Sequence, residues 1–236
     1  MTKPQLALVG TTEVAKTERR GRKPAWGAIV PGGASLRDLK LDALYETAAR
    51  IFNERGFHGT SIADLAGALG VSLSTLYYYI ESKQDLLYRL HDLTMKQAEH
   101  VMAEAPFRTD LTGLQRLYHC IYDYIIEIMR SPTATLVLFE ADALKPEHAA
   151  EILARRDKLE HGLRDVIQAG IDDGSIAPCD PKLAVFTVLG AINWITRWYK
   201  PAGPLAPEAI SVSMTAQLLR GLAVDPSSLP LPPPAR

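Results

Sequence analysis

TSIADLAGALGVSLSTLYYYIESKQDLL, residues 60–87, carries the most specific structural signal of this chain. Its polar and glycine residues predict two short helices joined by a turn. Thr60 or Ser61 can cap the first helix, IADLAGAL, which Gly70 ends, and Ser72 can cap the second helix, LSTLYYYI. Because two short helices joined by a glycine-containing turn form a helix-turn-helix, the sequence predicts this motif here.

The second helix of the motif carries more large side chains than one core can cover. Leu76 and Ile80 have the spacing of core residues, whereas Tyr77, Tyr78 and Tyr79 are consecutive. Neighbours on a helix lie about 100° apart, so the three tyrosines cannot all face inward. Hydroxyl groups at a helix surface and at a helix start suit contacts with phosphate groups. The alternative is a helical hairpin in a bundle that binds no nucleic acid.

The rest of the chain continues the pattern of helix caps, with no convincing strand signal. Asp110 can cap one helix, and proline follows Ser131, Lys145 and Asp180, as it often does at the first helical position. The sequence predicts an all-α fold of about nine helices. Those outside the motif are expected at residues 36–55, 83–105, 111–130, 131–144, 146–173, 181–200 and 207–222.

Residues 60–87 resemble the DNA-binding segment of the TetR/AcrR family of bacterial repressors. The family pattern is approximately T-x-x-x-I/L-A-x-x-A-G-V-S-x-G-x-L-Y-x-Y/H-F-x-S-K-x-x-L. The chain departs from it at Ser74, where Gly or Ala is usual, and at Ile80, where Phe is usual. The first change bears on base reading, and the second replaces one core residue by another.

The resemblance implies a division of the chain and a role for double-stranded operator DNA as partner. We expect a disordered basic arm at 1–34, a helix-turn-helix domain at 35–95, a ligand-binding and dimerisation domain at 96–225, and a disordered proline-rich tail at 226–236. The resemblance assigns phosphate contacts to five residues of the motif: Ser72, Thr75, Tyr77, Tyr79 and Lys83. It directs Leu73, Ser74 and Tyr78 to the major-groove edges of the bases, and Thr60 joins the DNA-binding set.

The expected arm carries a dense basic cluster. Lys16, Arg19, Arg20, Arg22 and Lys23 are opposed within it by Glu18 alone, although the whole chain has a net charge of −1. The Arg-Gly-Arg-Lys-Pro sequence within the cluster is close to the core by which AT-hooks enter a narrow minor groove. We expect Arg19, Arg20, Arg22 and Lys23 to contact DNA, either in that groove or as a solvated tail that raises non-specific affinity.

The segment AINWITRWYKPAGPL, residues 191–205, resembles a narrower group of these regulators. That group controls fatty-acid, sterol or aromatic-acid catabolism and commonly responds to acyl-coenzyme A thioesters. Such a ligand needs an apolar tunnel and cations for its phosphates. The candidate effector-binding residues are Trp194, Arg197, Trp198, Tyr118, Tyr122, Phe139, Arg155 and Arg156. A core or interface role for the tryptophans, and a solvated helix face for each arginine, remain the alternatives.

Small and large side chains share one stripe of the helix that contains this segment. The stripe comprises Thr187, Gly190, Ala191, Trp194 and Trp198. Together with the final helix it is expected to form a four-helix seam between two copies of the chain. We therefore expect a homodimer on a near-palindromic operator.

Several classes of protein are disfavoured by what the sequence lacks. It contains no GxSxG, HExxH, Walker or GxGxxG stretch, so we expect no catalytic residues, no cofactor and no enzyme activity. Cys120 and Cys179 are isolated, which predicts neither a disulfide nor a metal site. No apolar run reaches the ~18 residues of a membrane helix, which favours a bacterial cytoplasmic protein.

Two alternatives to an acyl-coenzyme A-responsive repressor remain. One is an efflux-system repressor that responds to drugs or lipophilic cations, with Glu140 and Asp142 as candidate acidic groups. The other, from a different class, is a small-molecule-binding scaffold that keeps the fold without using DNA.

Overall fold

The computed structural model describes residues 36–103, 110–131, 133–134 and 141–229. The expected basic arm, with Arg19, Arg20, Arg22 and Lys23, lies outside the described residues, as do Phe139 and Glu140. Within the described ranges the chain is helical and contains no strand, since the one β-bridge joins Ile176 to Ala223 in isolation. The all-α prediction is confirmed.

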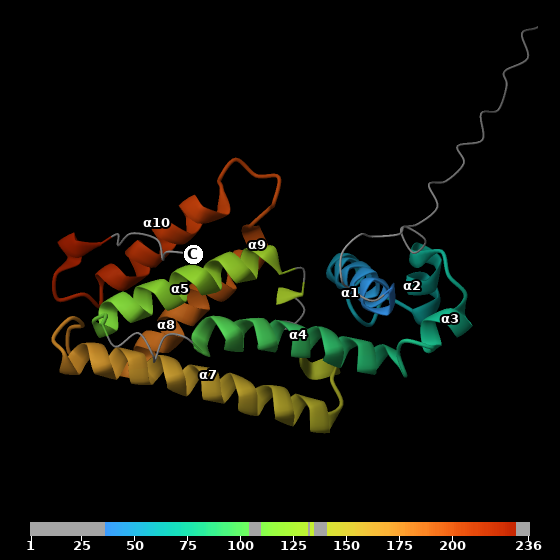
Figure 1. The fold of residues 1–236 in the computed structure, drawn as a ribbon, viewed down its shortest axis with the longest axis horizontal. Helices are drawn as coiled ribbons and strands as arrows, with labels where there is room; N and C mark the ends of the chain where they lie inside the picture. Colours follow the sequence, from blue (N-terminus) through green and yellow to red (C-terminus); the bar gives the residue numbers. More distant parts are fainter. Residues whose placement is uncertain (1–35, 104–109, 132, 135–140, 230–236) are drawn as a thin grey trace, which may run out of the picture.

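Three helices form a small domain at one end of the molecule (Figure 1): α1 (Leu36–Arg55), α2 (Ile62–Leu69) and α3 (Leu73–Tyr77). A capping box begins α2, because the Ser61 hydroxyl accepts from the amide of Asp64 while the Asp64 carboxylate accepts from the amide of Ser61. Gly70 ends α2 with φ 67°, a left-handed conformation that favours glycine. The capping residues and the glycine within the motif therefore account for the limits of α2 in the predicted helix-turn-helix.

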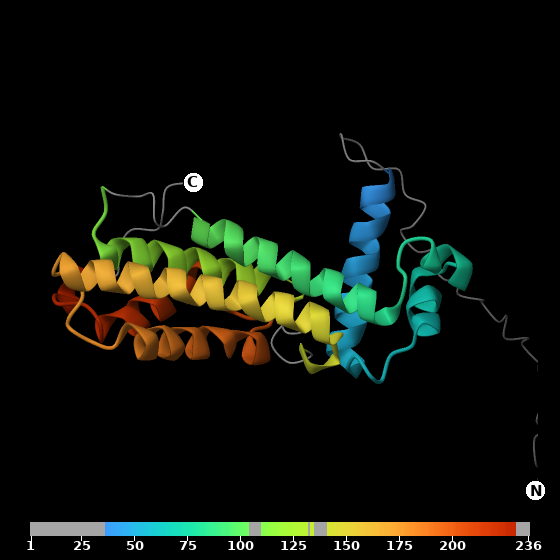
Figure 2. The same cartoon turned by 90° about the horizontal axis from the view of Figure 1, so that it is seen from below.

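The helix α4 (Lys83–Ala103) leaves this domain and continues into the C-terminal domain, where it runs alongside α7 (Pro146–Asp172) (Figure 2). The short 3₁₀ helix η3 (Ala141–Ala143) precedes α7. Leu144 and Ile152 are buried in the same cluster as the core of the small domain. The two domains are thus joined by a shared apolar contact as well as by α4.

The C-terminal domain is a helical bundle in which α5 is the central element (Figure 1). Besides α4 and α7, the bundle comprises α5 (Gly113–Arg130), α8 (Pro181–Asn193), α9 (Ile195–Trp198) and α10 (Pro207–Arg220). The start of α5 packs against the end of α7 so closely that a Cβ at Gly113 would lie 2.3 Å from the Cα of Gly170. Only glycine permits that approach.

Several helix boundaries differ from the sequence expectations. α3 ends at Tyr77, and α5 is capped by Thr112 with Gln115, where Asp110 was expected. The expected helix at 181–200 is divided between α8 and α9. The expected tail at 226–236 begins with described residues: the 3₁₀ helix η4 (Pro226–Ser228) follows α10, and Leu229 is buried in the C-terminal core.

Candidate DNA-binding surface and ligand cavities

The helix α3 is anchored by buried residues and presents bulky side chains to solvent. Leu76 and Ile80 are buried in the core of the small domain. Leu73 is 47% exposed, Tyr77 52% and Tyr78 71%, which is unusual for large apolar or aromatic groups. In Figure 1 α3 lies on the outer side of the small domain, away from the described C-terminal bundle.

Hydroxyl groups gather where α3 begins. The Ser72 hydroxyl accepts from the Thr75 amide at 3.1 Å and shares hydrogen bonds with the Ser74 hydroxyl at 2.9 Å and the Thr75 hydroxyl at 2.8 Å. Ser72 and Ser74 are exposed. The start of α3 therefore offers a fixed cluster of donors and acceptors beside the exposed Leu73.

Three other residues of the predicted DNA-binding set are used within the small domain. Lys83 Nζ donates to the carbonyls of Phe57 at 2.9 Å and Thr60 at 2.8 Å, and it lies 4.2 Å from the centre of the Phe57 ring. Thr60 is buried and its hydroxyl donates to the carbonyl of Gly56 at 3.0 Å. Tyr79 is half-buried against the domain core. Lys83 and Thr60 hold the turn between α1 and α2, and DNA contacts by all three residues remain predictions.

The second candidate site is a series of adjoining cavities between α4, α5, α7 and α8. A cavity of about 460 Å³ is lined by Met95, Met102, Leu163 and Phe186, with Arg156 and Asp157 at its wall. A cavity of about 420 Å³ shares Met102, Leu159 and Leu163 with the first and reaches Lys158 and Glu99. Both have mainly apolar walls and a few charged groups, as ligand sites commonly do.

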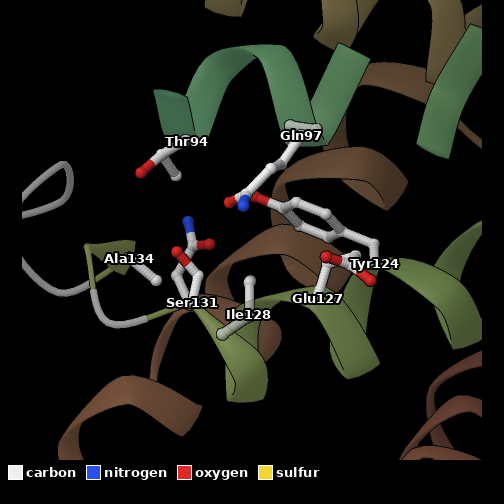
Figure 3. Close-up of a pocket in the computed structure, with 9 residues that line it drawn as sticks. Thr94, Gln97, Tyr124, Glu127, Ile128, Ser131 and Ala134 are labelled. Carbon is white, nitrogen blue, oxygen red and sulfur yellow. The ribbon is translucent and has the colours of Figure 1, made fainter. Parts of the chain in front are cut away.

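A small chamber of about 30 Å³ adjoins the larger cavity and shares Thr94, Ala98, Tyr124 and Asn193 with it. Most of its surface is apolar, and we call it the polar chamber because hydroxyl and amide side chains such as those of Ser131 and Asn193 also line it. Figure 3 shows the Tyr124 side chain crossing this chamber with its hydroxyl directed toward the Gln97 amide. Burial raises the pKa of the Tyr124 phenol to about 12, so the hydroxyl is neutral and can donate. Burial also lowers the pKa of Arg156, although a guanidinium stays charged near neutral pH.

An ion-pair cluster joins α4 to α7 beside the cavities. Arg155 donates to both carboxylate oxygens of Glu99, at 2.7 and 2.8 Å, and to Asp92 at 2.8 Å. One turn earlier on α7, Glu151 accepts from the Tyr88 hydroxyl, and His148 stacks on the Tyr88 ring at 3.9 Å. We call Asp92, Glu99 and Arg155 the α4–α7 clamp.

Comparison with known proteins agrees with this two-part arrangement. Residues 44–90 match the family described as bacterial regulatory proteins, tetR family. Residues 110–222 match the family described as tetracyclin repressor-like, C-terminal domain. The chain belongs to the TetR family. It is therefore a DNA-binding regulator with a helix-turn-helix at α2 and α3, and not an enzyme.

Relatives of this TetR-family protein span most of its length. The transcriptional repressor KstR2 of Mycolicibacterium smegmatis is 27% identical over 82% of this chain and 96% of its own. The structure of the regulator PfmR from Thermus thermophilus is 30% identical, covers 75% of this chain and 97% of its own, and has a TM-score of 0.70. AibR, solved in complex with isovaleryl coenzyme A and operator DNA, is 31% identical, covers 75% of this chain and 96% of its own, and has a TM-score of 0.67.

The predicted effector residues of this TetR-family protein are spread over several environments. Trp194, Arg197 and Trp198 are exposed on the outer side of α9 and its start. Tyr118 and Tyr122 are buried in the C-terminal core. Arg155 belongs to the clamp, whereas Arg156 lines the 460 Å³ cavity. Asp142, the acidic group of the efflux alternative, is exposed on η3. Effector binding by each of these residues remains a prediction.

Sequence reasoning missed the residues that line the cavities. Met102, Tyr124, Leu163 and Asn193 were not among the candidates, although each lines at least one cavity. Leu159 and Leu163 stand four residues apart on α7, a spacing that could have identified its inward face. Asn193 lies within the segment quoted for its tryptophans and carries no local signal of its own.

Neither a metal site nor a membrane span is present among the described residues. No group of three or more His, Cys, Asp or Glu side chains in these ranges is placed to hold a metal ion. None of the described helices is both long and apolar enough to cross a bilayer.

Proposed function

We propose that the protein is a homodimeric transcriptional repressor that leaves its operator when a small molecule, an acyl-coenzyme A thioester, occupies the cavities. The observation that carries this proposal is the course of α4. That helix begins beside the exposed α3 surface and ends among the residues that line both large cavities. A ligand that moves α4 would therefore move the DNA-binding domain.

The DNA-binding half of the proposal rests on the exposed face of α3. In a dimer, two such helices about 34 Å apart would enter successive major grooves of a near-palindromic site. Leu73 and Tyr78 would meet base edges, and the hydroxyls around Ser72 would meet phosphates. The site lies on bacterial DNA, so we propose a cytoplasmic location.

Dimerisation is supported by an apolar surface on α8 and α9. Phe186 is 50% exposed, Trp194 62% and Trp198 43%, and a Cβ at Gly190 would have no atom within 4 Å. Exposed large side chains beside a small residue suit close approach of a second copy. We propose that this surface, with α10, forms the dimer interface.

The effector class is supported by the cavities and by one similar structure. AibR was solved in complex with isovaleryl coenzyme A and operator DNA. The apolar walls around Met102 and Leu163 suit an acyl chain, and Lys158 and Arg156 can face anionic groups. A lipophilic cation is the second candidate effector, because Glu127 and Asp157 also line these cavities.

The α4–α7 clamp suggests how occupancy reaches the DNA. Glu99 lines the 420 Å³ cavity and also holds Arg155, which in turn holds Asp92 nearer the DNA-binding domain. A ligand that separates α7 from α4 would disturb this cluster. A coupling free energy of roughly 1–3 kcal/mol would lower the affinity for DNA about 5- to 150-fold when the ligand is bound. Bound DNA would lower the affinity for the ligand by the same factor.

Two measurements test the proposal. A DNase I footprint of the purified protein across its own promoter region should show a protected, near-palindromic site, and the absence of protection at moderate salt would contradict DNA regulation. A thermal-shift screen should find stabilisation by coenzyme A thioesters and none by lipophilic cations. Stabilisation by lipophilic cations alone would show that the effector is a cation and not a coenzyme A thioester.

A further inference from the structure

Asn193, the last residue of α8, has a buried carbonyl oxygen that the fold does not use. Its Oδ1 is inaccessible to solvent and has no hydrogen-bond partner among the described residues. A buried polar atom without a partner reduces the stability of the folded protein, and most such atoms in proteins are paired. The amide of Asn193 lines both the polar chamber and the 460 Å³ cavity, so its partner can come from a ligand.

Two hydroxyl groups of the same chamber are already engaged with the protein. The Thr94 hydroxyl shares a hydrogen bond with the Thr133 hydroxyl and also donates to the carbonyl of Leu90 at 3.1 Å. The Ser131 hydroxyl is 2.9 Å from the same Thr133 hydroxyl. These contacts fix the wall of the chamber, whereas the Asn193 oxygen is left as an acceptor that requires an N–H or O–H donor.

The cavities give the ligand a direction and a length. The chamber lies beside Thr94, in the middle of α4, and the 420 Å³ cavity reaches Ala103, the last residue of α4, and Lys158 on α7. Thr94 and Ala103 are roughly 14 Å apart along a helix that rises about 1.5 Å per residue. An extended chain of about twelve bonds spans that distance, at about 1.2 Å per bond.

We propose that the effector carries a hydrogen-bond donor, such as a hydroxyl group, at the end of its acyl chain remote from the thioester, and that Asn193 selects it. This inference rests on the proposed effector cavity. The donor pairs with Asn193 Oδ1 in the polar chamber, the chain lies along Met102 and Leu163, and the anionic end faces Lys158. Asn193 is then a specificity-determining residue, and a plain saturated chain leaves its oxygen unpaired.

The test uses matched ligands on the full-length protein. Isothermal titration compares decanoyl-coenzyme A, 10-hydroxydecanoyl-coenzyme A and the acceptor-only 10-methoxydecanoyl-coenzyme A. We expect the hydroxylated thioester to bind roughly tenfold tighter than the other two, as one neutral hydrogen bond would give. Equal affinity of the hydroxy and plain chains, or of the hydroxy and methoxy chains, would overturn the inference.

Substitution of Asn193 tests whether this residue causes the preference for the hydroxylated thioester. Asn193→Leu replaces the amide with an apolar group of similar size, so the variant should fold at least as stably as the wild type and should bind the hydroxy and plain chains equally. Gln168→Leu makes the same exchange at an exposed amide of α7 outside these cavities and should keep the tenfold preference. A preference that survives Asn193→Leu would overturn the role of Asn193.

The result is separable from that of the proposed function. The corresponding free acids are titrated in parallel, so that the preference is also measured without coenzyme A. If neither the thioesters nor the acids bind while the promoter footprint is intact, the inference fails and DNA regulation stands. If the hydroxyl preference is found but the promoter is not protected, the inference stands and the repressor proposal fails.

Discussion

Lys83 shows how one residue of the DNA-binding motif can serve the fold. Its ammonium group donates to two carbonyls of the turn between α1 and α2. Hydrogen bonds to a charged group typically contribute about 1.5–3 kcal/mol. We expect Lys83→Met to lower the free energy of unfolding by about that amount, measured by urea denaturation. A variant that is as stable as the wild type and loses only operator affinity would show that Lys83 is a DNA ligand alone.

Two neighbouring tyrosines of the motif have different environments, so DNA recognition and packing can be tested separately. Tyr78 is mostly exposed, whereas Tyr79 packs against the domain core and meets the Tyr78 ring edge-on at 5.1 Å between ring centres. Tyr78→Ala should change stability by less than about 0.5 kcal/mol and reduce operator affinity roughly tenfold. Tyr79→Ala is the matched control and should lose more than about 1 kcal/mol of stability. Unchanged operator affinity in Tyr78→Ala would remove Tyr78 from base reading.

His91 gives the protein a pH-dependent stability. It is fully buried on α4 without a hydrogen-bond partner among the described residues, and burial, with the nearby Arg156, lowers its pKa from 6.5 to about 4. Because the folded pKa is depressed, unfolding takes up a proton below pH 6.5, and stability falls as pH decreases toward 4. Between pH 7 and pH 5 the loss from this residue is about 1–2 kcal/mol.

His91→Leu tests that dependence. The variant has no titrating group at this position, so urea denaturation at pH 7, 6 and 5 should show a flatter decline than the wild type. His161→Leu makes the same exchange at an exposed position of α7 and is measured in parallel as the control. If the free energy of unfolding changes equally with pH in His91→Leu and in the wild type, burial of neutral His91 does not cause the pH dependence.

At the scale of elements, local signals account for helices whose ends are set by their own residues. The limits of α2 follow from Ser61, Asp64 and Gly70, and they agree with the sequence expectation. The division between α8 and α9 could not be predicted, because no proline or glycine marks it. There the Thr196 hydroxyl donates to the carbonyl of Asn193 at 2.9 Å, a side-chain contact of the kind that bends helices. Such a contact is seen only once the chain is folded.

The α4–α7 clamp is an element-scale feature with a clear pH signature. Hydrogen bonds from Arg155 lower the pKa of Glu99 despite burial. Burial opposes ionisation of Asp92, but hydrogen bonds from Lys96 and Arg155 outweigh it and lower its pKa as well. Depressed carboxyl pKa values contribute stability above the unfolded values, near 4, and that contribution is lost as pH falls through the folded values.

Arg155→Met removes the cation of the clamp. At pH 7 we expect a loss of about 1–3 kcal/mol in the free energy of unfolding, and a weaker decline of stability from pH 5 to pH 3 than in the wild type. Arg50→Met is the control, because its pair with Glu54 is exposed and contributes little. A loss equal to that of the control would show that the clamp does not hold α4 to α7.

At the scale of the whole molecule, the sequence revealed the DNA-binding end far better than the ligand end. The α3 surface is set by consecutive residues such as Tyr77 and Tyr78, which periodicity alone places outside the core. The cavities depend on four helices that are distant in sequence and meet only after packing. Tyr124 and Asn193 come from α5 and α8, and nothing in either segment indicates that they line one chamber.

The oligomeric state is also a property of the whole molecule. Trp194→Arg places a charge in the proposed dimer interface at a position that is exposed in one protomer, so the protomer itself should fold. Light scattering after gel filtration should give a monomer, with operator affinity lost as well. Leu153→Arg makes a similar exchange at an exposed apolar residue of α7 and should remain dimeric. A dimeric Trp194→Arg variant would place the interface elsewhere.

Fluorescence anisotropy can show whether a ligand in the cavities controls DNA binding by α3. A labelled fragment of the protein's own promoter is titrated with the full-length protein at about 0.15 M salt, with and without 10-hydroxydecanoyl-coenzyme A. We expect specific binding that weakens about 5- to 150-fold when the thioester is present. Binding that the thioester leaves unchanged, although calorimetry shows it bound, would contradict control of DNA binding by the ligand.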